Sequence, residues 1–150
     1  MPNKVLFDAI SDNILFCGYA NTALETWERI KTECDVVILP YSFDLQFKKL
    51  YETHFPSKLC EYLSLGMPVI IAGPSYATGV IWGLKNPKSV ITTTDKSLQH
   101  LQQQIQQLTQ SIDFRNEYSS NTRLLLKEFS TQNIKSKFYS LLQSHYIKKT

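Results

Sequence analysis

The stretch that decides the fold covers residues 53–70 and reads Thr-His-Phe-Pro-Ser-Lys-Leu-Cys-Glu-Tyr-Leu-Ser-Leu-Gly-Met-Pro-Val-Ile. A polar loop leads into a short helical pattern, which is followed by a glycine and an apolar strand pattern. We expect Ser57 to cap the helix and Gly66 to end it. The backbone N–H groups after Pro56 then point out of the first turn, where an anion is favourable.

Two charged side chains give this helix start a chemical character. Glu61 lies one turn in, where its carboxylate can accept hydrogen bonds from two sugar hydroxyls. Lys58 stands in the first turn, an unfavourable place for a cation unless an anion is near. The stretch therefore predicts a site for a phosphorylated ligand rich in hydroxyl groups. Without the flanking motif, the same two residues are ordinary solvated surface residues.

The composition of the chain favours one globular domain over residues 1–150. Of its 150 residues 43% are hydrophobic and 19% are charged, which is enough for a core of its own. A net charge of +3 with dispersed lysines argues against a nucleic-acid partner. The sequence shows no signal-peptide pattern and no apolar run long enough to span a bilayer, so we expect the protein in the cytoplasm.

Three cysteines, Cys17, Cys34 and Cys60, lie in or beside apolar runs. Their odd number and this placement predict buried thiols in a reducing compartment, not a disulfide framework. No cluster of cysteine and histidine has the spacing of a metal site, so we expect neither a metal nor a cofactor.

Short apolar strand patterns alternate with helical patterns, which predicts an α/β fold. We expect strands at residues 13–18, 35–40, 67–72 and 89–93. The second and third of these runs are typical of strands buried on both faces. The prediction is a Rossmann-like parallel sheet of about four strands flanked by helices, with residues 4–7 as a candidate fragment of an earlier element.

Helical patterns occupy the rest of the chain, including its last third. A Thr22–Glu25 capping box opens a helix at residues 23–34, and three more helices are expected at residues 98–112, 113–129 and 130–146. One face of the first helix is marked by Leu24, Trp27, Ile30 and Cys34. Ser130 is expected to cap the last helix, whose predicted inner side carries Ile134, Phe138, Leu141 and Leu142.

In open α/β sheets, ligands bind at the carboxyl ends of the strands, which directs attention to the loops after these strands. The loop at residues 41–56 is long and aromatic, so Tyr41 is a candidate ligand contact. Phe47 and Tyr51, at helical spacing, fit packing in a short helix better than ligand binding. Gly73 and Pro74 follow the third strand in a loop that lets a ligand approach the backbone.

These elements together resemble the C-terminal, nucleotide-sugar-binding domain of GT-B glycosyltransferases of the group 1 (family 4) kind. The residues that carry the resemblance are residues 35–40, Phe55, Glu61, Gly66, Pro68, Val69 and Ile70, with Phe129 and Ser130 opening the last helix. The resemblance covers about residues 13–146. It implies a retaining, metal-independent transfer of a sugar from a UDP- or GDP-type donor to an acceptor.

The resemblance also implies roles for individual residues. Glu61 matches the glutamate that binds the ribose hydroxyls of the nucleotide sugar. Ser57 and Lys58, with the preceding Phe55 and Pro56, match the loop and helix start that face the diphosphate and the donor sugar. The helix dipole and the lysine would stabilise the leaving nucleoside diphosphate.

Several family features are missing from the sequence. The first glutamate of the family's paired-glutamate motif falls on Thr53, and His54 stands where the family often has glycine. The N-terminal Rossmann domain, the first strands and the basic pair that grips the diphosphate have no counterpart. The expectation is half of a nucleotide-sugar site, inactive alone, which a missing Rossmann domain or a partner chain would complete. The full enzyme would work at the inner face of the membrane.

Two other classes of function stay open at this point. One is a non-catalytic doubly wound signalling or partner-binding module, although the strand at 35–40 ends in Pro40 where a receiver domain needs an aspartate. The other is a pure interaction role, in which a partner chain or another copy covers an exposed edge of the sheet.

Overall fold

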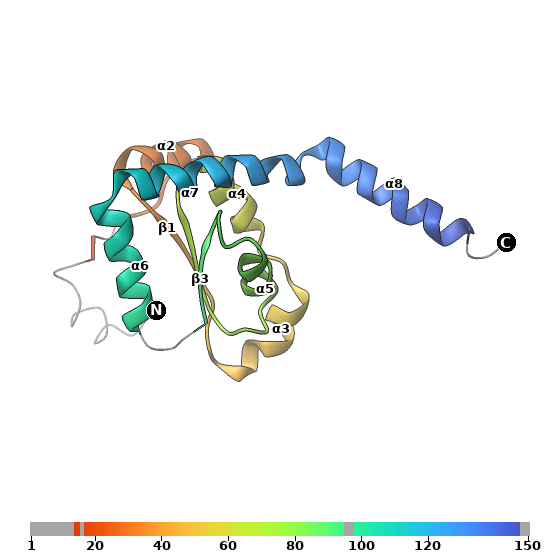
Figure 1. Ribbon diagram of the computed structural model, residues 1–150, viewed down its shortest axis with the longest axis horizontal. Coiled ribbons are helices and arrows are strands. Elements are labelled where there is room, and N and C mark those ends of the chain that lie inside the picture. Colours follow the sequence, from red (N-terminus) through yellow and green to blue (C-terminus); the bar gives the residue numbers. More distant parts are fainter. Residues whose placement is uncertain (1–13, 16, 95–97, 148–150) are drawn as a thin grey trace.

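The computed structural model describes residues 14, 15, 17–94 and 98–147 and shows an α/β fold built on a parallel sheet (Figure 1). Its strands are β1 (Val37–Pro40), β2 (Val69–Ala72) and β3 (Ile91–Thr93). They lie in the order β1-β2-β3, so β2 is central. In the register, Ile38 faces Ile70 and Ile70 faces Ile91.

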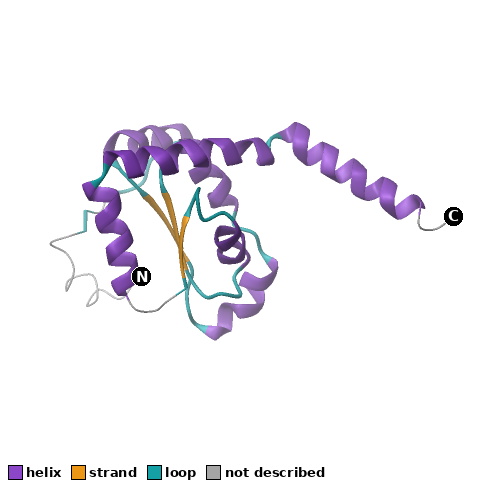
Figure 2. Ribbon diagram, in the orientation of Figure 1, coloured by secondary structure: helices purple, strands orange, loops and turns teal. Residues whose placement is uncertain are grey.

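Helices surround this sheet on both faces, as Figure 2 shows. In chain order they are α2 (Ala23–Glu33), η2 (Leu45–Phe47), α3 (Lys48–Thr53), α4 (Ser57–Leu65), α5 (Thr78–Lys85), α6 (Leu98–Gln110), α7 (Ile112–Leu125), η3 (Leu126–Phe129) and α8 (Thr131–Ile147). None of the helices in the described ranges is long and apolar enough to cross a membrane.

The core has one layer on each side of the central strand. Val69 and Ile71 of β2 join a cluster with Leu59 and Leu63 of α4, whereas Ile70 joins a cluster with Ile91 and Leu108 of α6. Val69, Ile70 and Ile71 all have an exposed fraction of zero. The prediction that residues 67–72 form a strand buried on both faces is therefore confirmed for β2.

The edge strand β1 differs from that prediction. Val37 and Leu39 are buried, but Ile38 is 42% exposed and Pro40 is also exposed. The hydrophobic cluster on the second face of the sheet contains residues of β2, β3, α6 and α7 but none of β1. A run of aliphatic residues thus forms a strand here with one of its faces open.

The described residues form three strands, not the four that we expected. Ile14, Leu15, Cys17 and Gly18 are not in a strand, and Leu15 is 86% exposed. The other expected strand residues, 13 and 16, and the candidate fragment at 4–7 lie outside the described part of the chain. An apolar run becomes a strand only when a neighbouring strand accepts its backbone hydrogen bonds, which these four residues do not find.

The predicted helices are confirmed, with small changes at their ends. Thr22 caps α2 by accepting a hydrogen bond from the Glu25 N–H at 3.1 Å, and Glu25 in turn accepts from the Asn21 N–H at 2.9 Å. Ser130 accepts a hydrogen bond from the Asn133 N–H at 3.3 Å at the start of α8. Short polar side chains therefore mark these helix starts as expected.

The apolar face that we predicted for α2 and the inner side that we predicted for α8 are largely uncovered. On α2, Leu24 is 62% exposed and Cys34 is exposed, while Ile30 alone among the four packs against the core. On α8 all four predicted inner residues are exposed, because the helix leaves the body of the molecule after η3 (Figure 1). The prediction failed because spacing shows that an apolar face exists but not what covers it.

The cysteines also differ from the prediction of buried thiols. Cys17 and Cys34 are exposed, and Cys60 on α4 is half-buried. Burial raises the pKa of the Cys60 thiol. Cys17 lies within the expected first strand, whose described residues are not in a strand, and Cys34 is the cap residue at the end of α2.

Side chains of α7 hold the turn that leads into β3. Tyr118 donates to the Pro87 carbonyl at 3.3 Å and Asn121 donates to the Lys88 carbonyl at 3.0 Å. The fully buried Thr122 donates to the Ser89 carbonyl at 2.7 Å. Three successive carbonyls are thereby satisfied by one helix, which attaches α7 firmly to the sheet.

Gly66 ends α4 as predicted, in the left-handed conformation with φ of 66°. A Cβ atom there would lie 2.6 Å from Nε of Arg123 on α7. Gly18 also has a positive φ, 71°, but a Cβ atom there would meet nothing within 4 Å. The two glycines thus share a backbone requirement and differ in steric surroundings.

We predict that Gly66→Ala lowers the free energy of unfolding more than Gly18→Ala does. Both substitutions place a side chain in the left-handed region, at a cost of about 1–2 kcal/mol. Only Gly66→Ala also displaces Arg123. Urea denaturation followed by circular dichroism measures both costs, and equal losses of stability would contradict the role assigned to Arg123.

Candidate functional site

The start of α4 lies at the carboxyl edge of the sheet, as the connection β1–α4–β2 requires. Pro56 occupies the cap position, with φ of −73° and ψ of 118°, and makes no side-chain cap hydrogen bond. Ser57 is the first residue of the helix, so the prediction that Ser57 caps it is wrong. Because Pro56 already has the extended backbone of a cap residue, the serine enters the helix and leaves the first-turn N–H groups without a side-chain acceptor.

A second helix start lies directly beside the first. The Thr78 hydroxyl at the beginning of α5 donates to the His54 carbonyl at 2.6 Å. A Cβ atom on Gly79 would lie 3.1 Å from Cγ of Pro56, so the two first turns are in close contact. Ala77 occupies the cap position of α5, again without a side-chain cap hydrogen bond.

The other helix starts in the described chain are of two kinds. Two of them, α3 and η3, continue directly from a preceding helical segment and also have no side-chain cap. The starts of α2, α7 and α8 each have a threonine or serine oxygen that accepts a first-turn N–H, from Thr22, Ser111 and Ser130 respectively. The starts of α4 and α5 lack such an acceptor, although they lie side by side. Each contributes partial positive charge and free N–H donors to the same place, which suits an anion.

Lys58 and Glu61 form an ion pair on the first turn of α4. Lys58 Nζ lies 2.7 Å from Glu61 Oε2, and the side chains are 61% and 33% exposed. The hydrogen bond to Glu61 raises the pKa of Lys58, and the charge of Glu61 adds to the shift. The predicted cation and carboxylate are thus adjacent and accessible to a ligand, while each holds the other in place.

Tyr41 fills the space beside the two glycines of this edge. Its backbone N–H donates to the Ala72 carbonyl at 2.7 Å, which continues the pairing of β1 with β2. A Cβ atom on Gly73 would lie 2.6 Å from Cβ of Tyr41, and one on Gly79 would overlap the Tyr41 hydroxyl. The glycines therefore accommodate this tyrosine, and the buried Pro74 accepts a hydrogen bond from Ala77 at 3.0 Å.

The hydroxyl of Tyr41 is buried without a hydrogen-bond partner among the described residues. Burial raises the pKa of Tyr41, and the nearby N–H of Gly79 opposes this shift. The hydroxyls of Tyr76, Thr92 and Thr93 are likewise buried and unpaired in the described chain. Three of these four residues lie at the carboxyl edge of the sheet. Tyr41 follows β1, Thr93 ends β3, and Tyr76 lies in the loop after β2.

The remaining predicted site residues have structural contacts. Phe55 packs against Trp82 and Phe129, with ring centroids 6.2 Å away in each case. The Thr53 hydroxyl donates to the Lys49 carbonyl at 2.9 Å within α3. His54 contributes its carbonyl to Thr78, and its side chain is exposed. Of the predicted set, the structure brings together Pro56, Ser57, Lys58 and Glu61.

Sequence reasoning missed the start of α5 and the packing role of Tyr41. The contact of Gly79 with Pro56 joins residues that are far apart in the chain, so no local pattern predicts it. The one local signal is the series Tyr76-Ala77-Thr78-Gly79, in which a helix begins without an Asp, Asn or Ser at its cap.

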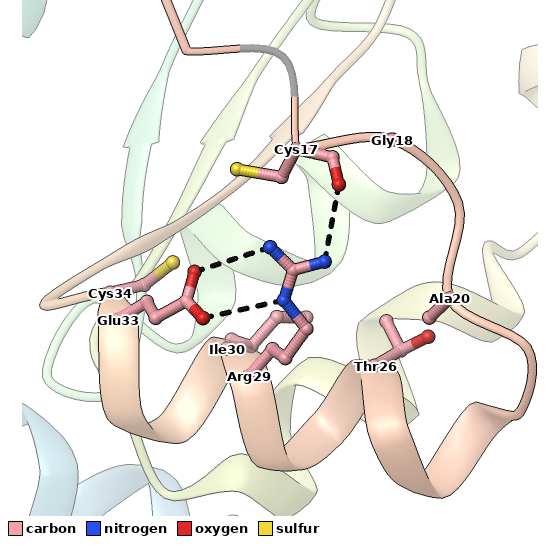
Figure 3. A pocket seen from close by; sticks show the side chains of 8 residues that line it. All are labelled: Cys17, Gly18, Ala20, Thr26, Arg29, Ile30, Glu33 and Cys34. Carbon is pink, nitrogen blue, oxygen red and sulfur yellow. Dashed lines mark hydrogen bonds and ion pairs between the residues drawn. The ribbon is translucent and has the colours of Figure 1, made fainter.

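A separate pocket of about 190 Å³ lies beside α2, shown in Figure 3. Arg29 crosses it, donating to the Cys17 carbonyl at 3.2 Å and to the Glu33 carboxylate at 3.3 Å. The pair with Glu33 raises the pKa of Arg29. The charged groups that line this pocket pair with one another, and none of the residues that line the pocket belongs to α4 or α5. Among the described residues, no group of three histidine, cysteine or acidic side chains could hold a metal ion.

No known protein family matches the chain, and no solved structure does. The chain is similar to Nucleolar GTP-binding protein 1 of Eremothecium gossypii and to the protein of the same name from Kluyveromyces lactis. Each is 32% identical over 68 residues, which is 45% of this chain. The matched part is 10% of each relative, so the chain spans about a tenth of their length.

We predict that Tyr41→Phe leaves the free energy of unfolding unchanged or raises it by up to about 1 kcal/mol, because the hydroxyl that it removes is buried and unpaired. Tyr118→Phe is the matched control. It removes a hydroxyl bonded to the Pro87 carbonyl, and we expect a loss of about 0.5–1.5 kcal/mol. Thermal and urea unfolding measure the stability of both variants. A loss of stability in Tyr41→Phe would show that the Tyr41 hydroxyl has a hydrogen-bond partner.

Proposed function

We propose that the chain is the nucleotide-sugar-binding part of a GT-B glycosyltransferase C-terminal domain of the group 1 (family 4) kind. The observation that carries the proposal is the pair of adjacent helix starts without side-chain caps at the carboxyl edge of the parallel sheet. With Glu61 one turn in, this edge offers donors for a diphosphate and an acceptor for hydroxyl groups. A nucleotide sugar carries both of these chemical groups.

Each part of the edge has a role in the proposal. The first-turn N–H groups of Ser57 and Lys58 on α4, and of Thr78 on α5, donate to the phosphate oxygens. The Glu61 carboxylate accepts hydrogen bonds from the ribose hydroxyls. Lys58, which pairs with Glu61 at 2.7 Å, shifts toward the diphosphate and stabilises the charge that develops as the sugar leaves.

The proposal assigns donor binding to this chain and acceptor binding to another domain. The reaction is the transfer of a sugar from a UDP- or GDP-type donor, retaining and metal-independent by resemblance. A second Rossmann domain or a partner chain would hold the acceptor and close over the sugar. The chain alone is expected to bind the donor weakly and not to turn it over.

Two alternative functions decide which other ligands should be tested for binding. The relatives are named as GTP-binding proteins, so GTP is included beside the nucleotide sugars. A signalling module would instead accept a phosphoryl group with Mg²⁺, which incubation with acetyl phosphate tests. Stable phosphorylation of the chain would replace the glycosyltransferase proposal.

We predict that Glu61→Ala weakens the binding of a UDP- or GDP-sugar in calorimetric titrations. Loss of charge-assisted hydrogen bonds to two ribose hydroxyls should cost about 1.5–3 kcal/mol, or roughly 10- to 150-fold in Kd. Lys58→Ala should weaken the binding of the nucleotide sugar more than the binding of the nucleoside alone, because the substitution removes a charge that faces the diphosphate.

Glu52→Ala is the matched control, since Glu52 pairs with Lys48 at 3.7 Å on the neighbouring helix in an ion pair that is also partly exposed. We expect this variant to bind as the wild type does. Equal binding by Glu61→Ala and wild type would remove Glu61 from the site, and a preference for GTP over every nucleotide sugar would contradict the proposed donor.

A further inference from the structure

The last helix presents an apolar face that the described part of the chain does not cover. Ile134, Phe138, Leu141 and Leu142 lie on one side of α8 at helical spacing, and their exposed fractions are 52%, 57%, 63% and 43%. In a globular domain such a stripe faces the core. Here α8 extends away from the sheet and from the other helices after Ser130 (Figure 1). We call these four residues the α8 face.

A second uncovered apolar surface lies at α2. Leu24 is 62% exposed and Trp27 is 36% exposed, and Tyr19, just before the helix, is 96% exposed. We call these three residues the α2 face. Figure 1 shows α2 and α8 at opposite ends of the molecule, so the α8 face of one chain does not reach the α2 face of the same chain.

The charges around the two faces are complementary. Residues 131–147 contain Lys135 and Lys137 and no aspartate or glutamate. Residues 23–35 contain four acidic residues against Arg29 and Lys31, of which Arg29 already pairs with Glu33. Two α8 helices packed together would bring like charges near each other, whereas α8 beside α2 brings opposite charges together.

The exposed area is large enough for a specific contact. The seven side chains of the two faces are 36–96% exposed, which corresponds to roughly 100 Å² each when the area of an aromatic side chain, on the order of 150–250 Å², sets the upper scale. Burying both faces removes on the order of 700 Å² per copy, close to the ~800 Å² per partner of a standard interface.

We propose that the α8 face of one copy binds the α2 face of a second copy, reciprocally, in a two-fold symmetric dimer. Because the two faces lie at opposite ends of the molecule, two copies side by side in opposite directions make both contacts at once. Such an interface is closed, since each copy uses both of its faces. The occupant of each apolar face is thus a second copy of this chain. This inference does not depend on nucleotide binding.

Sedimentation equilibrium on the 150-residue chain tests the dimer, whose mass is twice the 17.3 kDa of one copy. Phe138→Asp on α8 and Leu24→Asp on α2 should each weaken the dimer by at least about 30-fold, the scale of a central interface residue. Ser136→Asp is the matched control, because it adds the same charge on the opposite side of α8. It should remain dimeric, and circular dichroism confirms that all three variants are folded.

Mixing the two variants gives the decisive result. In a mixed dimer, the intact α8 face of Leu24→Asp meets the intact α2 face of Phe138→Asp, so one of the two contacts is restored. We therefore expect the equimolar mixture to dimerise more strongly than either variant alone. A monomeric wild type up to millimolar concentration overturns the proposal. So does a dimer that either substitution leaves intact, or a mixture that associates no better than its components.

Discussion

The complete removal of β2 from water is the constraint on which the rest of the structure depends. Val69, Ile70 and Ile71 have no exposed surface, and each face of this strand lies under a different helical layer. Because β2 also pairs with β1 and β3, its position decides where all three strands end. The starts of α4 and α5 lie at that same edge, so the candidate site is a consequence of how the central strand is buried.

The parts of the fold that the sequence predicts correctly depend on signals local in the chain. The run from Ser57 to Ala72 contains a helix, a left-handed glycine and an unbroken apolar strand, and all three form as expected. The failures concern surfaces that need a partner from elsewhere. The apolar run at 13–18 predicts a strand but cannot show whether a neighbour accepts its hydrogen bonds. The stripe on α8 predicts an inner side but cannot show what lies against it.

The same division applies to the candidate site. Lys58 and Glu61 are three residues apart on one helix, so their proximity is readable from spacing alone. The contacts of Tyr41 with Gly73 and Gly79 join positions more than thirty residues apart, and no local pattern announces them. A glycine-containing loop indicates that something approaches the backbone, and here the approaching group is a side chain of the same protein. Position 41 and the two glycines therefore form one steric unit.

The attachment of α7 to residues 87–89 has a consequence for what the edges of the sheet offer to an added strand. An open strand edge is a template on which another chain can add, and both β1 and β3 are edge strands in the described sheet. The carbonyls that lead into β3 are occupied by Tyr118, Asn121 and Thr122. At the other edge, β1 has four residues and ends in Pro40, which has no N–H to donate. The segment that leads into β3 therefore offers no free carbonyl at residues 87–89, and the β1 edge offers an added strand no donor at position 40.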